Sequence, residues 1–567
     1  MSHDAEPTHR PWHWWVSALA TAAFTVWLTS PLWRTLDRLF VGRLATDGIV
    51  TPWFQDWVGR RLLSGGDLHT IHSFDWPGGV PRTVEFPSLA DAWLTAPVTW
   101  LLGWPGQWNA SLALAVGINA LGGWALTRAL GLGPLAAVVA GCLAALARPV
   151  WADFIMARLN VAFPGLVLLA LAGLVWSSPG GPGRRLKHRL AAGLLAAVAG
   201  GLGALIYPPF VLMMVPLGLL AAAGPLRRHG PGALGLPLLV LAATLAVCWP
   251  WLTEIAANPG RPPECGPVAC ADRYHMLSVY RIALWDAIVE DGLTLSGIAA
   301  APWVLAPLGL LHRRTRRPAC LLGIVAVAFA GLSMGPCPQT FDGIEWPGAR
   351  SIAARLEPVW CFADRLHDWG RFASAAALLT ALLAAFGVDA LDRRRGVGRA
   401  LALAMAVFAI GMSTRQLLPE LLDPRRWHRP ERPASARFLQ INSIDGPVAD
   451  LPYDRSLQFQ SALFAPDSPR LNPLRLGPYR PRTGALGWVD ALGNGRITHP
   501  APTAADLSAT GLEWIVWDAS RCRHGPDQAA CASTVKDAIE SVVGEGRTLS
   551  DGLVVWKLTP ENDASRP

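Results

Sequence analysis

Charged side chains are scarce in this sequence. Asp, Glu, Lys and Arg together make up 16% of the 567 residues, whereas hydrophobic residues make up 52%. A soluble domain typically carries about 25% charged residues, and a soluble protein of this length needs more polar surface than this chain supplies. The same apolar content excludes a disordered chain. The composition therefore predicts a polytopic membrane protein with a soluble portion.

Lysine is almost absent. Only Lys187, Lys536 and Lys557 are lysine among the 49 basic residues.

The chain has no Walker A loop, so a nucleotide-sugar donor is disfavoured. A net charge of +8 is compatible with nucleic-acid binding, but the arginines form short clusters between apolar runs. That distribution is typical of membrane topology, and we expect no nucleic-acid partner.

Long apolar runs are abundant instead. A membrane-spanning helix needs about 20 mostly apolar residues, and we find about eleven candidates. They cover 13–31, 109–128, 133–149, 161–177, 190–207, 209–224, 233–252, 294–311, 318–335, 373–391 and 398–415. A further run at 87–104 contains Asp91 and two prolines. We expect it to lie in the interface or to re-enter the membrane.

The basic clusters orient these spans, because short basic connections lie preferentially on the cytoplasmic side. With eleven spans and a cytoplasmic N-terminus, all five short basic connections fall inside, whereas a crossing at 87–104 would place four of them outside. They are Arg128, Arg184 to Arg189, Arg227-Arg228, Arg313 to Arg317 and Arg393 to Arg395. The many Ala, Gly and Arg residues are typical of a GC-rich bacterial genome. We therefore expect a multi-pass protein of the bacterial inner membrane.

The composition changes after residue 415. Pro, Asp, Arg and Ser become frequent, and no later run is long enough to span a membrane. Short β-type runs at 446–452, 512–518 and 552–558, with a helix-like stretch at 531–544, are typical of a small α/β domain. We expect residues 1–415 to form the membrane domain and residues 416–567 an extracytoplasmic α/β domain.

Six of the nine cysteines fall in regions expected outside the cytoplasm. An even number in an oxidising compartment indicates disulfides. We expect the local pairings Cys265–Cys270, Cys337–Cys361 and Cys522–Cys531. A metal site is the alternative, but no C-x-x-C pair accompanies these cysteines.

The first outer loop, 32–86, concentrates polar chemistry. Carboxylates beside a membrane suit a general base acting on a lipid-borne substrate. The stretch Asp67, His69, His72 and Asp75 is rich in metal ligands, although its spacing matches no zinc pattern. We therefore keep the four as a candidate site for a divalent metal, and His69, His72 and Asp75 as candidates for substrate binding. For any single loop acid, simple solvation is the alternative.

Several segments, in order, carry a family resemblance. An N-terminal span leads to a long outer loop with an early Asp, then W-x(n)-L-x-x-G-x-x, a P-G-G element and about ten further spans. Together they resemble the GT-C superfamily of polyprenyl-phosphate-sugar glycosyltransferases. WGRFASAAALLTALLAAFGVDAL (369–391), PVADLPY (447–453), GLEWIVWD (511–518) and DGLVVWKL (551–558) resemble YfhO-type bacterial membrane proteins.

The resemblance implies an inverting hexosyl transfer. The donor is a polyprenyl-phosphate sugar and the acceptor a glycan or lipid of the cell envelope. Asp47 occupies the place of the catalytic first-loop Asp, whose carboxylate deprotonates the acceptor hydroxyl, and Asp56 is the second candidate. Asp47 is followed by Gly48 rather than by a second acid, unlike the protein-mannosylating members, which leaves the acceptor class open.

A lipid-phosphate donor also needs a cation at the outer interface. Arg371 lies at the expected outer start of the tenth span, and Arg148 is a lesser candidate. Snorkelling toward headgroups is the alternative for either arginine.

Two other functions compete with transfer. A lipid or polysaccharide transporter usually places ionisable residues within its spans, whereas the spans here are nearly free of charge. A non-catalytic membrane scaffold of the same fold is the second, because a fold does not imply a function.

The topology is directly testable. An alkaline phosphatase reporter fused after residue 416 should be active, because that segment is expected outside the cytoplasm. The same reporter in the cluster Arg313 to Arg317 should be inactive. Equal activity at both positions would contradict the eleven-span topology.

Overall fold

A computed structural model describes most of the chain. The described residues are 11–36, 39–41, 47–74, 77–81, 90–155, 159–178, 186–207, 210, 213–219, 230, 235, 238–239, 242–246, 248–249, 253, 300–333, 372–394, 396–423, 427–428, 433–444, 446–453, 462, 464, 469–471, 482–494, 500–518, 528–549 and 552–558. The chain divides into two compact units: residues 1–42, 105–256 and 261–428 form the first, and residues 43–104, 257–260 and 429–567 form the second.

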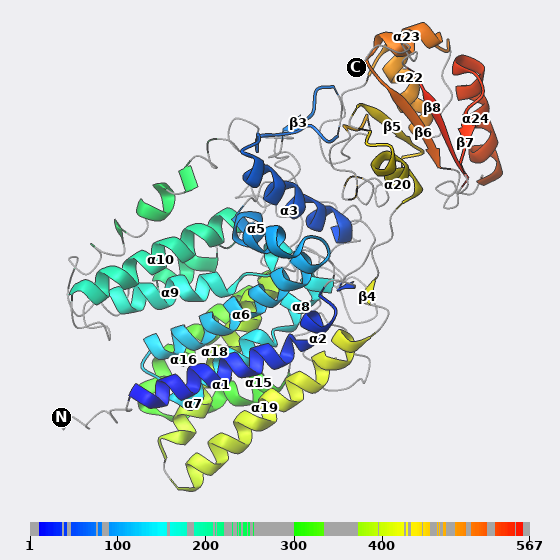
Figure 1. Ribbon diagram of the computed structural model, residues 1–567. Coiled ribbons are helices and arrows are strands. Elements are labelled where there is room, and N and C mark those ends of the chain that lie inside the picture. The colour runs from blue at the N-terminus through cyan, green and yellow to red at the C-terminus, as the bar shows by residue number, and fades with distance from the viewer. Residues whose placement is uncertain are drawn as a thin grey trace, which may run out of the picture. The chain divides into compact units, whose positions relative to one another are not determined.

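The first unit is a helix bundle (Figure 1). Its helices are α1 (Pro11–Leu28), α2 (Ser30–Arg34), α6 (Gly106–Ala129), α7 (Pro134–Ala145), α8 (Arg148–Ile155), α9 (Gly165–Ser177), α10 (Leu186–Ile206), α15 (Ala300–Leu305), α16 (Arg313–Ser333), α18 (Phe372–Asp392) and α19 (Val397–Leu422). Two 3-10 helices, η1 (Leu159–Val161) and η5 (Ala306–Leu311), and the strands β1 (Phe40–Val41) and β4 (Trp427–His428) complete it.

Seven helical segments among the described residues are long and apolar enough to cross a membrane. They are Gly106–Ala129, Pro134–Phe154, Leu159–Ser177, Leu186–Ile206, Thr315–Leu332, Phe372–Asp392 and Val397–Pro419. Each coincides with a run predicted from the sequence, which confirms a polytopic helical membrane protein.

The other four predicted spans are not among these seven segments. The run 13–31 overlaps α1, a helix of 18 residues. The run 294–311 overlaps α15 and the adjoining η5, six residues each. The runs 209–224 and 233–252 lie largely outside the described residues, so their spans stay predictions.

Helix α18 lies at the centre of the bundle. All of the apolar span in α18 is buried within the protein, whereas only 22% of the corresponding span is buried in α16 and in α19. It packs against α16, α19, α7 and η5 (Figure 1). Helix α19 instead exposes apolar side chains such as Leu403 and Val407. Since an apolar face turned outward is stable only in lipid, α16 and α19 carry part of the lipid-facing surface.

Small residues allow the helices to approach closely. A Cβ atom at Gly165 would overlap the backbone of Ile118 and Asn119, so only glycine permits this crossing of α6 and α9. The approach brings Asn119 onto the start of α9. Its Oδ1 accepts a hydrogen bond from the Gly165 N–H at 2.7 Å, and its Nδ2 donates to the Ala162 carbonyl at 3.0 Å.

A tight turn joins α6 to α7, and Asp389 of α18 closes it. The Gly131 N–H bonds to the Arg128 carbonyl and the Leu132 N–H to the Thr127 carbonyl, with Gly131 at φ +75°. This is a Schellman ending, which favours glycine at that position. The Gly133 N–H, at the start of α7, then donates to Asp389 Oδ1 at 2.8 Å.

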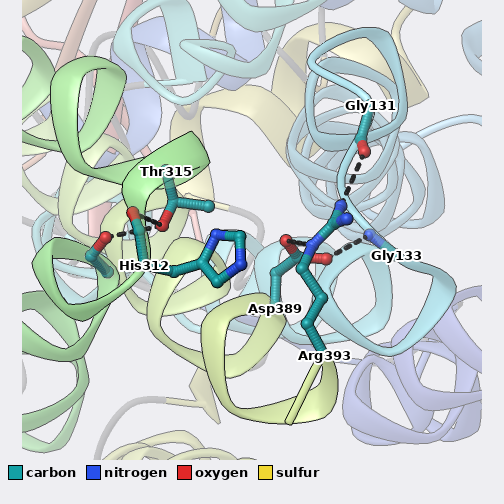
Figure 2. Close-up of polar contacts among 7 residues, drawn as sticks. Gly131, Gly133, His312, Thr315, Asp389 and Arg393 are labelled. Carbon is teal, nitrogen blue, oxygen red and sulfur yellow. Dashed lines mark hydrogen bonds and ion pairs between the residues drawn. The ribbon is translucent and has the colours of Figure 1, made fainter. Parts of the chain in front are cut away.

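Arg393 completes this contact (Figure 2). Its Nε donates to Asp389 Oδ2 at 2.6 Å and its Nη2 lies 3.4 Å from the Gly131 carbonyl. The carboxylate is 2% exposed. One buried carboxylate therefore binds both the N-terminus of α7 and Arg393, which lie far apart in the sequence.

The second unit contains the first outer loop and the C-terminal part of the chain. In the loop, α3 (Asp47–Ser64) packs against α5 (Ala90–Leu102), and β2 (Thr70–Ile71) pairs antiparallel with β3 (Val80–Pro81). α5 has 13 residues, too few to cross a membrane. The loop core contains Trp53, Phe54, Trp57 and Phe74, and Ala462 from the C-terminal part packs into it.

The C-terminal part folds around a four-stranded sheet of order β5-β6-β8-β7. Its strands are β5 (Val448–Leu451), β6 (Trp514–Asp518), β7 (Arg547–Thr548) and β8 (Leu553–Lys557), and its helices are α20 (Ala434–Ile441), α22 (Gly484–Gly493), α23 (Ala504–Ala509) and α24 (Gln528–Val543). β5 pairs parallel with β6, and β8 pairs antiparallel with β6 and β7.

Side chains alternate between the two faces of this sheet. Ile515 and Trp517 join a core with Val489 of α22 and Ile539 of α24. Val516, which points the other way, packs with Phe438 and Leu439 of α20. The predicted α/β domain, its three strands and its helix are therefore confirmed. The predicted boundary after residue 415 stays a prediction, since α19 continues to Leu422 and the loop 43–104 groups with 429–567.

We predict that Asp389→Ala destabilises the bundle by about 3 kcal/mol, the cost of removing one partner from a buried ion pair. The Gly133 N–H and Arg393 would lose their shared acceptor. Thermal unfolding of the purified protein in detergent measures the effect. Asp392→Asn is the control, because Asp392 pairs with Arg399 at 3.6 Å on a surface where the arginine is 79% exposed. Equal midpoints for the two variants would contradict the central role of Asp389.

Candidate functional site

Strand β1 fixes the point at which the first loop leaves the bundle. Asn109 of α6 donates from Nδ2 to the Leu39 carbonyl at 2.6 Å and accepts from the Val41 N–H at 3.4 Å. Trp108 Nε1 donates to the Val41 carbonyl at 2.9 Å. Phe40 and Val41 also pair with His428 and Trp427. Val41 is therefore fixed by Asn109, Trp108 and its pairing with Trp427, six residues before Asp47.

Helix α3 separates the two predicted catalytic acids. Asp47 is its first residue, and Asp56 follows nine residues later. At about 100° and about 1.5 Å per residue, the two positions face opposite sides of the helix and lie about 13 Å apart along its axis. Asp47, at the helix N-terminus, occupies the end that favours anionic groups.

Asp56 is buried in an ion pair. Arg60 Nε donates to its Oδ2 at 2.7 Å, and the Asp56 side chain is 4% exposed while that of Arg60 is 54% exposed. Burial raises the pKa of Asp56, and the attraction and hydrogen bond of Arg60 oppose that rise only in part. This environment suits a residue that fixes the helix surface. Its catalytic role stays a prediction.

Asp91, which follows the first outer loop in the sequence, is a buried acid with a raised pKa. It lies in the first turn of α5 and is 1% exposed. Within the described residues its Oδ1 has no hydrogen-bond partner. Burial raises its pKa to about 6, against the effect of nearby backbone N–H groups and of the Gln55 amide on α3. The sequence showed Asp91 only as an acid inside an apolar run.

The predicted ligand set assembles in part. Asp67 accepts hydrogen bonds from the backbone N–H of His69 at 2.7 Å and of Thr70 at 3.2 Å, and the His69 bond is the main reason that its pKa is lowered. His72 Nε2 lies 3.8 Å from Asp67 Oδ2. Asp75 lies outside the described residues. No group of three or more potential metal ligands occurs among the residues that the structure describes.

Other predicted residues also lie outside the described part. These are Arg371, Cys265, Cys270, Cys337, Cys361 and Cys522. Cys531 lies in α24, and only its backbone is described. Cys142, Cys248 and Cys320 are free thiols. The disulfides and the Arg371 clamp therefore stay predictions.

Besides Asp389, two further acidic or basic side chains are buried in the described part of the bundle. Arg148 begins α8 and is 3% exposed, and Asp153 on the same helix is fully buried. Buried ionisable residues at the ends of membrane spans are costly and mark functional positions. The sequence pointed to Arg148 but gave no separate reason to select Asp153, whose burial only the fold reveals.

Comparisons with known proteins identify the fold. ArnT from Cupriavidus metallidurans, in its apo crystal structure, aligns over 95% of this chain and 98% of its own, with 15% identity and a TM-score of 0.50. The arabinofuranosyltransferase AftD from Mycobacteria aligns over 90% of this chain and 35% of its own, with 15% identity and a TM-score of 0.51. No protein-family profile and no curated protein sequence matches the chain.

The chain therefore has the fold of GT-C membrane glycosyltransferases, as its sequence resemblance implied. The alignment with ArnT runs over nearly the whole of both chains, so it includes the helix bundle, the first loop and the C-terminal part. The closer likeness to YfhO-type proteins stays a prediction.

Asp91 makes stability depend on pH. Its pKa is raised on folding, so its favourable contribution is complete below about pH 4 and is lost as the pH rises through about 6. We expect a lower melting midpoint at pH 7.5 than at pH 5. Asp91→Asn should reduce that difference and raise the midpoint at pH 7.5. Asp67→Asn is the control, because the lowered pKa of Asp67 acts in the opposite sense. A wild-type pH profile in Asp91→Asn would contradict this assignment.

Proposed function

We propose that the chain is an integral-membrane glycosyltransferase that moves a sugar from a polyprenyl-phosphate donor to a glycan or lipid acceptor of the cell envelope. The single observation that carries the proposal is the alignment with ArnT over nearly the full length of both chains. The first loop adds to it, because a helix that begins with Asp47 follows a firmly anchored strand. We place the reaction at the outer face of the bacterial inner membrane, as the basic clusters imply.

Asp47 is the proposed general base. Its carboxylate takes the proton of the acceptor hydroxyl while that oxygen attacks the anomeric carbon, and the lipid phosphate leaves with the electrons of the broken bond. Attack opposite the leaving group inverts the anomeric configuration. The position of Asp47 at the start of α3, on the face opposite to the Asp56–Arg60 pair, supports Asp47 over Asp56. Arg371 remains the proposed partner of the donor phosphate.

The proposal is tested by the fate of the donor. Cells that lack the chain should accumulate a polyprenyl-phosphate sugar, detectable by mass spectrometry of lipid extracts. The wild-type gene should remove it. General bases typically contribute about 10²- to 10⁴-fold to rate, so Asp47→Asn, expressed at the wild-type level, should leave the donor at the deletion level.

Asp67→Asn is a matched control on the same loop. An asparagine keeps one side-chain oxygen, which can still accept the 2.7 Å hydrogen bond from the His69 N–H, and loses only the 3.2 Å bond from the Thr70 N–H on an exposed turn. This variant should therefore restore wild-type lipid levels. Full activity of Asp47→Asn would refute the general base and transfer the assignment to Asp56. An unchanged lipid profile in the deletion strain would refute transfer and favour the non-catalytic scaffold.

A further inference from the structure

One arginine of the bundle lies among three tryptophans. The Arg128 guanidinium carbon is 5.3 Å from the ring centroid of Trp14, 5.4 Å from that of Trp124 and 5.5 Å from that of Trp176. Arg128 occupies the last turn of α6 and is exposed. The rings come from the first turn of α1, the end of α6 and the end of α9. Three helix ends thus meet around one cation.

Arg128 differs from Arg393 and Arg399, two arginines at the ends of spans that have carboxylate partners. Arg393 has the Asp389 carboxylate at 2.6 Å and Arg399 has that of Asp392 at 3.6 Å. In the described part of the chain, no carboxylate lies within ion-pair distance of Arg128. Among the described residues, the groups that offset its charge are the ring faces and the carbonyl end of α6.

Further positive charge lies close by. Arg189 of α10 donates from Nε to the Ser177 carbonyl at 2.9 Å, beside Trp176 at the end of α9. Lys187 and His188 occupy the same first turn of α10 and are exposed. This surface, which we call the Arg128 cluster, consists of Arg128, Arg189, Lys187 and the three tryptophans. By the positive-inside rule it lies at the cytoplasmic end of the spans.

An apolar path extends from the cluster along the spans. Leu121 lies two turns before Arg128 on the same face of α6 and is 50% exposed. On α10, Leu190 and Leu194 are exposed as well. A molecule with an anionic head and an alkyl tail fits this order of groups, since the head meets the cations and the tail meets the leucines.

We propose that the Arg128 cluster binds the headgroup phosphate of an anionic phospholipid in the cytoplasmic leaflet. The guanidinium edge offers N–H donors to two phosphate oxygens while the rings contact its faces. Tryptophan at the interface favours the same depth in the bilayer, and the basic turn of α10 adds attraction for an anionic surface. The site is separate from the first loop and does not depend on the proposed transferase activity.

Native mass spectrometry of the detergent-purified full chain tests the site. Phosphatidylglycerol, the anionic probe, should bind in preference to phosphatidylcholine. Loss of a charge-assisted contact typically costs about tenfold or more in affinity, so Arg128→Gln should weaken phosphatidylglycerol binding by about that factor. Arg128→Lys, which keeps the charge without the planar fork, should fall between. Arg399→Gln, an exposed arginine already paired with Asp392, should bind as the wild type does.

Each other outcome overturns the proposal. Wild-type binding by Arg128→Gln would show that Arg128 only anchors α1, α6 and α9 through its ring contacts. Equal binding of the two lipids would show a general hydrophobic surface. Displacement of phosphatidylglycerol by millimolar inorganic phosphate would indicate a soluble phosphate ligand. Because Arg128→Gln could also weaken folding, the melting midpoint is measured with and without lipid, and the proposal requires that the lipid-induced increase be lost.

Discussion

The bundle depends on the carboxylate of Asp389. A fully buried helix such as α18 has no lipid-facing side, so its end must satisfy its polar neighbours within the protein. Asp389 does this for the Gly133 N–H and for Arg393, and through them it closes the α6–α7 turn. The turn already uses Gly131 at positive φ. The carboxylate thus joins a local helix ending to the centre of the fold.

Glycine residues also allow close packing around α18. A Cβ atom at Gly387 would overlap the Leu305 carbonyl, and Gly165 allows α9 to meet α6. Van der Waals contact and a few buried hydrogen bonds, such as those of Asn119, supply the association that the hydrophobic effect does not provide in lipid. Large apolar side chains instead point outward on α10, α16 and α19.

The sequence predicted the elements better than their assembly. Hydropathy located seven spans because a membrane imposes a length and a composition on each helix. Short runs of β-type residues located β5, β6 and β8, because both faces of the sheet are covered and its strands are therefore apolar along most of their length. The packing of Ala462 into the core of the first loop depends on contacts between segments far apart in the chain. No local pattern encodes such contacts.

The same limit applies to the candidate site. Asp56 and Arg60 stand four residues apart, so their ion pair was readable from helical spacing, yet the sequence analysis treated Asp56 only as a candidate acid. Asp91 and Asp153 become candidates because their side chains are buried. A single sequence does not report burial. The resemblance selected Asp47, and helical geometry then separated it from Asp56.

The position of α18 in the chain has a consequence for biosynthesis. Residues 372–392 leave the ribosome after α1, α6, α7, α9 and α10 have been made, yet they form the most buried helix. Until α18 inserts, the Gly133 N–H and the face of α7 that it covers have lipid or the insertion machinery as neighbours. The early helices therefore persist as an incomplete bundle during translation, and a chain interrupted before residue 372 leaves the face of α7 that α18 covers without its protein neighbour.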